Sequence, residues 1–262
     1  MTGTKELNYG KLADALKNAE MTCIPICAIS KENPEIEISD AYAIQLLNIQ
    51  REVDDGKKIT GKKIGLTSLA MQNLLGVNRP DFGHLLNTME VKDEIVNRKT
   101  LLQPKVEGEL AFVLKKDLTG PGVTSKDVIE ATDYVVPSIE IVDSRIANWK
   151  INIIDTVADN ASSGMYVIGK DRIDPINTDL LSIRMKLFKN GECINEGIGS
   201  DVLGDPAVAV AWLANTLSEF GVSLKKGEIV LSGAFSAALA AEAGDEFTAV
   251  YENIGEVKVK FI

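Results

Sequence analysis

Apolar residues recur at helical spacing in the first part of the chain. In two stretches between residues 5 and 55, most of them stand three or four positions apart, which puts them on one face of a helix. They are Leu7, Leu12, Ala15 and Leu16 in the first stretch and Tyr42, Leu46, Ile49 and Val53 in the second. Asn33-Pro34 separates the two predicted helices, and Ser39 is a candidate N-cap for the second. Thr67 is predicted to cap a further short helix that ends near Leu75.

Alternating apolar and polar positions, which are typical of strands, predominate after residue 76. The run over 183–188 leads into an Asn190-Gly191 pair, which favours a two-residue hairpin turn. One later helix is well signalled, because Asp205 suits its N-cap, Pro206 its first turn and Gly221 its end. These patterns predict an α+β protein with a helical N-terminal lobe over 1–75 and a strand-rich catalytic domain over 76–262.

Three glutamates lie on two segments with strand-like sequences. Glu107 and Glu109 are two residues apart, so they project from the same face of a strand, while Glu140 lies within the largely apolar segment 136–142. Carboxylates are costly to bury unpaired. The pattern leaves two interpretations open, which are acids on the solvated face of a sheet and a buried trio that holds a divalent cation. Oxygen donors without a neighbouring Cys or His favour Mg²⁺ or Mn²⁺ over Zn²⁺.

Composition narrows the function classes. The 262 residues include 28 basic and 38 acidic side chains, a formal net charge of −10, so no nucleic-acid partner is expected. No apolar run has the length of a membrane span and no signal peptide is recognisable, so we expect a cytoplasmic protein without membrane contact. His84 is the only histidine, which excludes a site with two His ligands, and the three cysteines fit no zinc framework.

Six segments, spread over most of the chain, carry a family resemblance. They are Gly61-Lys-Lys-Ile-Gly-Leu-Thr67, Arg79-Pro-Asp-Phe-Gly83, Pro104-Lys-Val-Glu-Gly-Glu-Leu-Ala111, Ile139-Glu-Ile-Val-Asp-Ser-Arg145, Asp155-Thr-Val-Ala-Asp-Asn-Ala-Ser162 and Leu231-Ser-Gly233. Each alone is a weak signal, but together they occur in the family's order. The chain resembles the fumarylacetoacetate hydrolase-like superfamily and, within it, the 2-keto-4-pentenoate (2-hydroxypenta-2,4-dienoate) hydratases of aromatic meta-cleavage pathways. The resemblance implies a mixed β body.

For the metal site, the resemblance implies a cation held by Glu107, Glu109 and Glu140, with Mg²⁺ or Mn²⁺ as the expected ion. The implied substrate is a small 2-hydroxy-dienoate or 2-oxo acid whose 1-carboxylate and 2-oxygen bind that cation. We also expect a homo-oligomer, which could associate with another enzyme of the same pathway.

Three further residues receive a role from the resemblance. Lys63 is implied to be the base that takes the 2-hydroxyl proton, after which C5 is protonated and water adds at C4. A lysine beside a dication is expected to have a lowered pKa. Ser162 and Leu66 are implied to contact the substrate, and Ser162 is implied to form a hydrogen bond to the substrate carboxylate. A solvated position is the commoner fate of a lysine, and we expect it for the neighbouring Lys62.

Asp81 bears on the choice between two sister chemistries. As the resemblance has it, hydratases carry an acid at this position and 4-oxalocrotonate decarboxylases an apolar residue. Asp81 therefore favours a hydro-lyase that converts 2-hydroxypenta-2,4-dienoate to 4-hydroxy-2-oxopentanoate, with Asp81 activating water or moving a proton. Alternatively, Asp81 only forms a turn after Pro80. The alternative functions of the chain are a 4-oxalocrotonate decarboxylase, an acylpyruvate C–C hydrolase and a non-catalytic partner subunit. The hydrolase would need a His-Glu pair, for which His84 is poorly placed.

Overall fold

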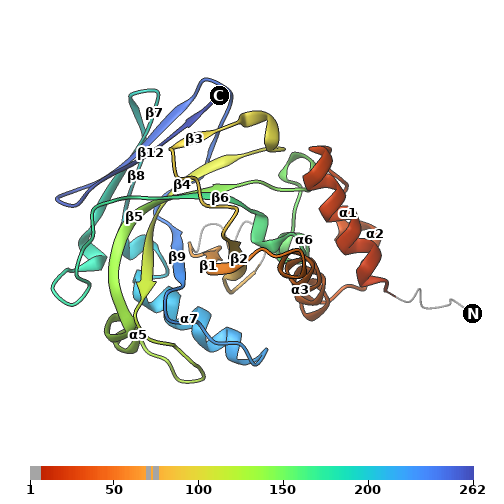
Figure 1. The fold of residues 1–262 in the computed structure, drawn as a ribbon, viewed down its shortest axis with the longest axis horizontal. Coiled ribbons are helices and arrows are strands. Elements are labelled where there is room, and N and C mark those ends of the chain that lie inside the picture. Colours follow the sequence, from red (N-terminus) through yellow and green to blue (C-terminus); the bar gives the residue numbers. More distant parts are fainter. Residues whose placement is uncertain (1–6, 69–71, 73–76) are drawn as a thin grey trace, which may run out of the picture.

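The structure, a computed structural model, describes residues 7–68, 72 and 77–262. A group of N-terminal helices stands beside a body built from two β-sheets (Figure 1). The α-helices are α1 (Tyr9–Thr22), α2 (Ile29–Glu32), α3 (Ile38–Asp54), α5 (Ser125–Ala131), α6 (Ile153–Ala158) and α7 (Pro206–Ser218), and the 3₁₀ helices are η1 (Arg98–Thr100), η2 (Ala147–Trp149), η3 (Asn160–Ser162), η4 (Leu180–Ser182) and η5 (Gly199–Asp201). Within the described ranges, no helix is long and apolar enough to cross a bilayer.

The larger sheet has the strand order β2-β1-β9-β4-β5-β6, with β10 paired to β4, and the smaller has the order β3-β12-β11-β7-β8. Parallel pairing joins β1 to β9 and β3 to β12, and the other neighbours pair antiparallel. The strands are β1 (Ile59–Gly65), β2 (Asp81–Leu86), β3 (Ile95–Val96), β4 (Lys105–Leu114), β5 (Thr132–Val142), β6 (Ser163–Ile168), β7 (Arg184–Lys189), β8 (Glu192–Ile198), β9 (Ile229–Ala234), β10 (Leu239–Ala240), β11 (Glu246–Tyr251) and β12 (Gly255–Phe261).

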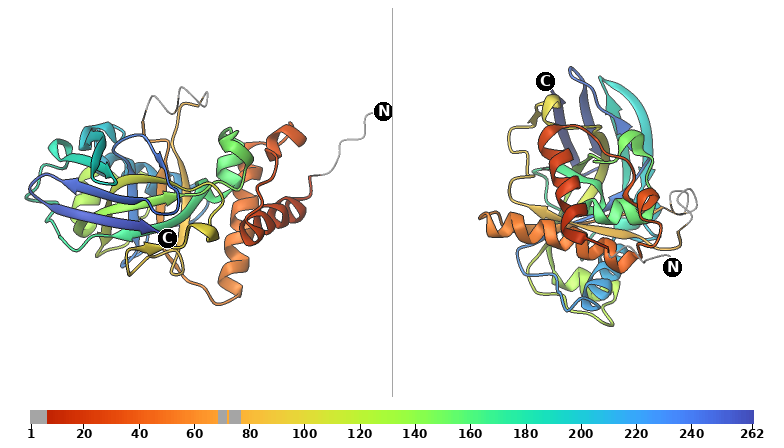
Figure 2. Two further views of the ribbon diagram at one scale, coloured as in Figure 1. Left: turned by 90° about the horizontal axis from the view of Figure 1, so that it is seen from above. Right: turned by 90° about the vertical axis from the view of Figure 1, so that its right-hand side faces the viewer.

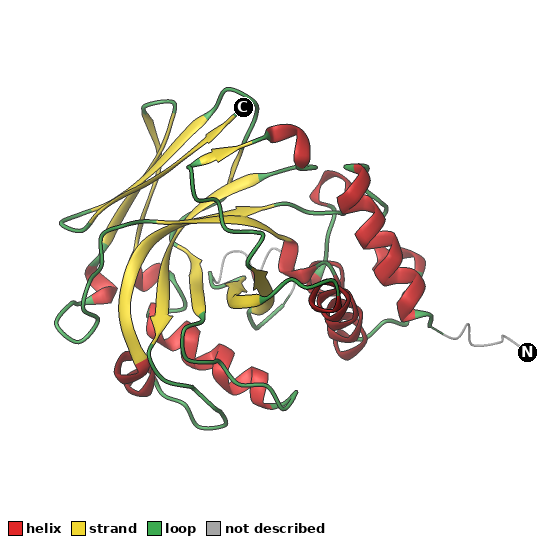
Figure 3. Ribbon diagram, viewed as in Figure 1, coloured by secondary structure: helices red, strands yellow, loops and turns green. Residues whose placement is uncertain are grey.

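The helices pack on the sheets and on one another in two groups. The large sheet curls, and α5 and α7 pack together beneath it, with α7 against β9 (Figure 1). The helix α3 packs against α1 and α6, and Figure 2 shows this helical group at one end of the molecule. Figure 3 shows the longer helices at one end of the molecule and beneath the strands, so the α+β prediction is confirmed.

Local signals account for two elements as predicted. The Asp205 side chain accepts the Ala207 N–H at 2.8 Å, and Pro206 occupies the first helical position of α7. Asn190 and Gly191 have φ values of 53° and 83°, as a tight hairpin turn between β7 and β8 requires. Both predictions are confirmed.

Two other expectations concern the start of α3 and the segment that ends at residue 75. Ser39 is not the N-cap of α3, because the helix begins at Ile38 and the Glu37 N–H donates to the Asp40 carboxylate at 2.8 Å. An acid one turn into the helix therefore does what we assigned to a serine. The helix expected up to residue 75 falls largely outside the described residues, as does the 75/76 boundary, which stays a prediction. The strand β1, on the N-terminal side of that boundary, belongs to the large sheet.

Candidate metal centre and active site

The three glutamates meet where β4 and β5 pair. Glu107 lies directly opposite Glu140 in the antiparallel register, and Glu109 follows two residues further along β4. Each residue offers a carboxylate oxygen, and these oxygens lie within 4.8 Å of one another. Glu109 and Glu140 are buried and Glu107 is half-buried. The structure thus brings Glu140 of β5 beside Glu107 and Glu109, which strand alternation placed on one face of β4, and that face is not solvated.

The environment of the trio disfavours three negative charges. Burial, followed by the charge of Glu140, raises the pKa of Glu107 to about 7, and burial raises the pKa values of Glu109 and Glu140 as well. Glu109 accepts one hydrogen bond, from the Gly233 N–H at 2.9 Å. Neither carboxylate oxygen of Glu140 receives a hydrogen bond within the described part of the chain. Buried, under-satisfied oxygen donors of this kind fit a hard divalent cation, which would supply the missing positive charge.

Lys63 approaches the trio from β1. Its ammonium lies 3.3 Å from a Glu140 oxygen and donates to the Ala161 carbonyl at 3.1 Å. Burial alone would lower the pKa of Lys63, but Glu140 and the neighbouring carboxylates outweigh burial and raise it. The solvated position expected for Lys62 is wrong, because this lysine is also buried and pairs with Glu228 at 2.8 Å. The reason is that β1 is an inner strand of the large sheet that α7 and η3 contact, so this segment is not a solvated loop.

Asp81 begins β2 opposite Gly65 of β1, so the interpretation as a simple turn residue is wrong. The side chain is buried, and its Oδ2 accepts the Thr156 hydroxyl at 3.2 Å. Burial raises the pKa of Asp81. A Cβ on Gly65 would lie 2.2 Å from Asp81 Oδ1 and 3.4 Å from Lys63 Nζ. The missing side chain at Gly65 therefore lets the acid and the lysine come close together.

A cavity of about 210 Å³ joins these groups. Lys63, Asp81 and Glu107 line it, together with Leu66 and Ser162. The Ser162 hydroxyl is buried and has no hydrogen-bond partner among the described residues. The residues proposed for metal, catalysis and substrate contact thus lie in or against one cavity, and the remaining wall is largely apolar.

Comparisons with known proteins identify relatives over most of the chain. The sequence profile of the fumarylacetoacetate (FAA) hydrolase C-terminal family matches residues 84–262. The chain belongs to this family. It is 48% identical over 254 residues to 2-hydroxyhexa-2,4-dienoate hydratase from Comamonas testosteroni, covering 96% of this chain and 95% of that protein. It is 45% identical over 250 residues to 2-keto-4-pentenoate hydratase from Paraburkholderia xenovorans (strain LB400), covering 95% and 93%.

A solved structure is similar over nearly the whole chain. It is 4-oxalocrotonate decarboxylase from Pseudomonas putida G7, complexed with magnesium and adipate. The TM-score is 0.95 at 37% identity, with 99% of this chain and 100% of that chain covered. The FAA hydrolase resemblance stated from the six segments is confirmed, and so is its position among hydratases and decarboxylases.

Asn160, which the sequence analysis did not single out, positions the turn beside the candidate site. Its side-chain Oδ1 accepts the His84 N–H at 2.7 Å, and its Nδ2 donates to the His84 carbonyl at 2.9 Å. Asn160, Ala161 and Ser162 all have positive φ values. The amide thus ties a left-handed turn to β2 and fixes the Ala161 carbonyl that holds Lys63. The only sequence signal for Asn160 was its place in the segment 155–162, which contributes to the family resemblance.

His84 has a structural role in this chain. Its Nδ1 lies 3.0 Å from Gln45 Oε1, and Gln45 Nε2 donates to the Phe82 and Val157 carbonyls. The amide orientation therefore makes Nδ1–H the donor. Burial, and then the charge of Lys62, lower the pKa of His84 to about 3, so the ring is neutral. His84 does not line the active-site cavity.

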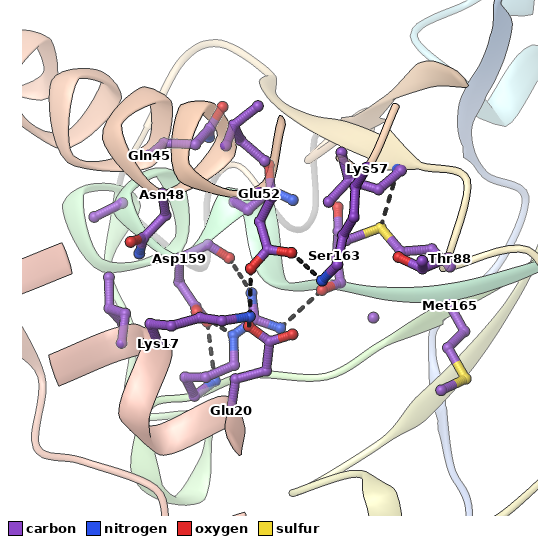
Figure 4. A pocket seen from close by; sticks show the side chains of 18 residues that line it. Lys17, Glu20, Gln45, Asn48, Glu52, Lys57, Thr88, Asp159, Ser163 and Met165 are labelled. Carbon is purple, nitrogen blue, oxygen red and sulfur yellow. Dashed lines mark hydrogen bonds and ion pairs between the residues drawn. The ribbon is translucent and has the colours of Figure 1, made fainter. Parts of the chain in front are cut away.

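A second cavity, of about 150 Å³, lies among α1, α3 and the segment 158–165 (Figure 4). Its charges pair with one another. Glu52 contacts both Lys17, at 2.6 Å, and Lys57, while Arg145 pairs with Asp159. Each of these cations therefore has a carboxylate partner. The Lys17–Glu52–Lys57 pairs lie within the N-terminal segment, and the Arg145–Asp159 pair lies within the body.

Proposed function

We propose that this chain is a metal-dependent hydro-lyase that adds water to 2-hydroxypenta-2,4-dienoate (2-oxopent-4-enoate) and forms 4-hydroxy-2-oxopentanoate in aromatic meta-cleavage degradation. The observation that carries the proposal is the trio of carboxylates within 4.8 Å of one another, beside a cavity lined by Lys63 and Asp81. The similarity to two hydratases over more than nine-tenths of the chain supports it. 2-Hydroxyhexa-2,4-dienoate, the substrate in the name of the relative from Comamonas testosteroni, is the second substrate to test.

The acidic residues and the lysine divide the chemistry. Glu107, Glu109 and Glu140 would hold Mg²⁺ or Mn²⁺, which supplies Lewis-acid polarisation of the substrate's carboxylate and 2-oxygen when bound. Lys63 would take the proton from the 2-hydroxyl. The carboxylates that raise its pKa are balanced once the site is loaded, so the lysine can then release and accept a proton near neutral pH.

The remaining polar groups would bind and orient. The Asp81 carboxylate, held by Thr156 through one oxygen, has a second oxygen without a partner among the described residues, which would position the water that adds at C4. The Ser162 hydroxyl would donate to the substrate carboxylate, and Leu66 would pack against the carbon chain. A short apolar tail suits the small, largely apolar remainder of the cavity.

Decarboxylation of 4-oxalocrotonate is the second candidate, because of the similarity to the decarboxylase from Pseudomonas putida G7. Asp81 argues against it, since a buried acid near Lys63 repels the distal carboxylate of that substrate and manages water instead. The test is to incubate the purified chain and Mg²⁺ with each substrate and identify products by NMR. Formation of 4-hydroxy-2-oxopentanoate supports the proposal. CO₂ release from 4-oxalocrotonate without hydration of the pentadienoate contradicts it.

A homo-oligomer, association with another enzyme of the same pathway and a cytoplasmic location complete the proposal. The first two follow from the family resemblance, and the third from the composition and the lack of a recognisable signal peptide or membrane span in the sequence. Size measurement of the purified protein tests the first of them.

A further inference from the structure

The active-site cavity holds a second cation that the proposed reaction does not yet use. Lys105 lines the cavity and lies two residues before Glu107 on β4, so both side chains project from the same face. The ammonium sits over the Trp149 ring, 4.2 Å from its centroid. Lys105 forms no ion pair within 4.0 Å in the described part of the chain, unlike Lys63, which pairs with Glu140.

The indole under this lysine is fixed by its own loop. Trp149 Nε1–H donates to the Gln103 carbonyl at 3.0 Å, and the Asn148 N–H donates to the Gln103 side chain at 2.6 Å. Asn148 and Trp149 have φ values of 60° and 54°, a conformation that non-glycine residues rarely adopt and that persists where the surroundings enforce it. A cation over an aromatic face is attracted to it, so the loop holds the ammonium at the cavity wall without a neutralising partner.

Geometry along the strand decides what this cation meets. Lys105 pairs with Val142, and the next cross-strand pair with the same facing is Glu107 with Glu140, about 7 Å further on. Lys63 and Asp81 approach the trio from β1 and β2 instead. If the 2-oxygen lies at Lys63 and the carbon chain runs toward Asp81, the 1-carboxylate must project away from Asp81. Among the described residues that line the cavity, Lys105 is the cation left to receive it.

We propose that Lys105, held on the Trp149 face, is a substrate-binding residue for the 1-carboxylate of a 2-oxo acid. The inference rests on the proposed function, because it takes the direction of the substrate from the roles of Lys63 and Asp81. Charge supports it. Lys63 must be neutral to accept the 2-hydroxyl proton, so three glutamates and a divalent cation leave one net negative charge, and an incoming carboxylate needs a further cation.

The test is a binding titration with a ligand that cannot react. Calorimetry with saturating Mg²⁺ would measure the Kd of 2-oxopentanoate for the wild type and for Lys105→Met. Loss of a hydrogen bond between charged groups is expected to raise this Kd about 10- to 100-fold. Lys105→Arg keeps the charge and should recover most of the affinity. Lys126→Met, at a side chain 84% exposed on α5, is the matched control and should leave the Kd unchanged.

Mn²⁺ binding, followed by electron paramagnetic resonance, separates this role from an effect on the metal. Removal of a cation beside Glu107 should leave Mn²⁺ affinity unchanged or tighten it. A parallel loss of Mn²⁺ affinity, or an unchanged Kd for 2-oxopentanoate in a folded Lys105→Met, overturns the inference alone. Should Lys105→Met not fold, Lys105→Gln takes its place under the same criteria. A wild type that binds Mg²⁺ but not 2-oxopentanoate would remove the proposed function and the inference with it.

Discussion

Substitution of Glu109 by Gln should change stability in opposite directions with and without metal. Glu109 is 1% exposed, and its Oε2 accepts the Gly233 N–H, an interaction that a glutamine oxygen can keep. The substitution therefore removes a charge while preserving shape and the hydrogen bond. In the metal-free protein it relieves repulsion within the trio. In the loaded protein it removes a ligand.

The magnitude follows from the separation of the charges. Two carboxylate oxygens 4.8 Å apart repel by about 3 kcal/mol at an effective dielectric constant of 20. Burial and the neighbouring glutamates already raise the pKa of Glu109, so part of this repulsion is avoided by protonation. At pH 8 we expect Glu109→Gln to raise the free energy of unfolding of the metal-free protein by about 1–3 kcal/mol. The wild type should gain about 2.7 kcal/mol from a metal at 100 times its Kd, and the variant almost none.

The assay is thermal unfolding at pH 8 with EDTA and with Mg²⁺, where each kcal/mol moves the Tm by about 2–4 °C. Glu130→Gln, at an exposed acid on α5, is the control and should follow the wild type in both conditions. A Glu109→Gln protein that is less stable than the wild type in EDTA would show that the trio is not a repulsive cluster. A variant that keeps the full Mg²⁺ stabilisation would refute Glu109 as a ligand.

Three further predictions concern single residues. Lys63→Met should lower kcat about 10²–10⁴-fold, the usual contribution of general-base catalysis, with a smaller change in substrate affinity; near-normal turnover would transfer the role elsewhere. Asp81→Ala should lose hydration of the pentadienoate while keeping Mn²⁺ affinity, and retained hydration would exclude Asp81 from water activation. His84 has a pKa of about 3 in the fold against 6.5 when unfolded, so the folded state loses stability as pH falls below 6.5 toward 3, by about 2 kcal/mol between pH 7 and 5. His84→Asn, which retains an Nδ1-like donor, should lose about 2 kcal/mol less than the wild type over that interval in urea titrations, and equal losses would contradict a neutral buried imidazole.

Local rules were sufficient where the deciding interaction is local. The Asp205-Pro206 start of α7 and the Asn190-Gly191 turn depend on neighbours within a few residues, and both were predicted correctly. The Ser39 cap failed because the helix begins two residues earlier, with Glu37 as its N-cap, and the Glu37 N–H donates to Asp40. Chain-local signals thus locate an element and leave its exact first residue open.

The site divides in the same way. Strand alternation was enough to put Glu107 and Glu109 on one face, because that property belongs to a single strand. Lys63 and Asp81 came only from the family resemblance, since their approach depends on the pairing of β1 with β2 and on the absence of a side chain at Gly65. Lys105 was not singled out from the sequence, because its place in the cavity wall depends on the distant Trp149 loop.

The contact between Lys63 and Glu140 depends on the shape of the whole sheet. β1 and β5 are separated by β9 and β4, so in a flat sheet their backbones would lie about 14 Å apart. The ammonium and the carboxylate nevertheless lie 3.3 Å apart, which requires the sheet to curl around the cavity. β1 and β9 also approach each other closely, since a Cβ on Gly61 would lie 1.9 Å from the Ile229 carbonyl oxygen. Lys63 and Glu140 therefore meet through the shape of the sheet, and this is why spacing in the sequence could pair Glu107 with Glu109 but could not place Lys63 beside them.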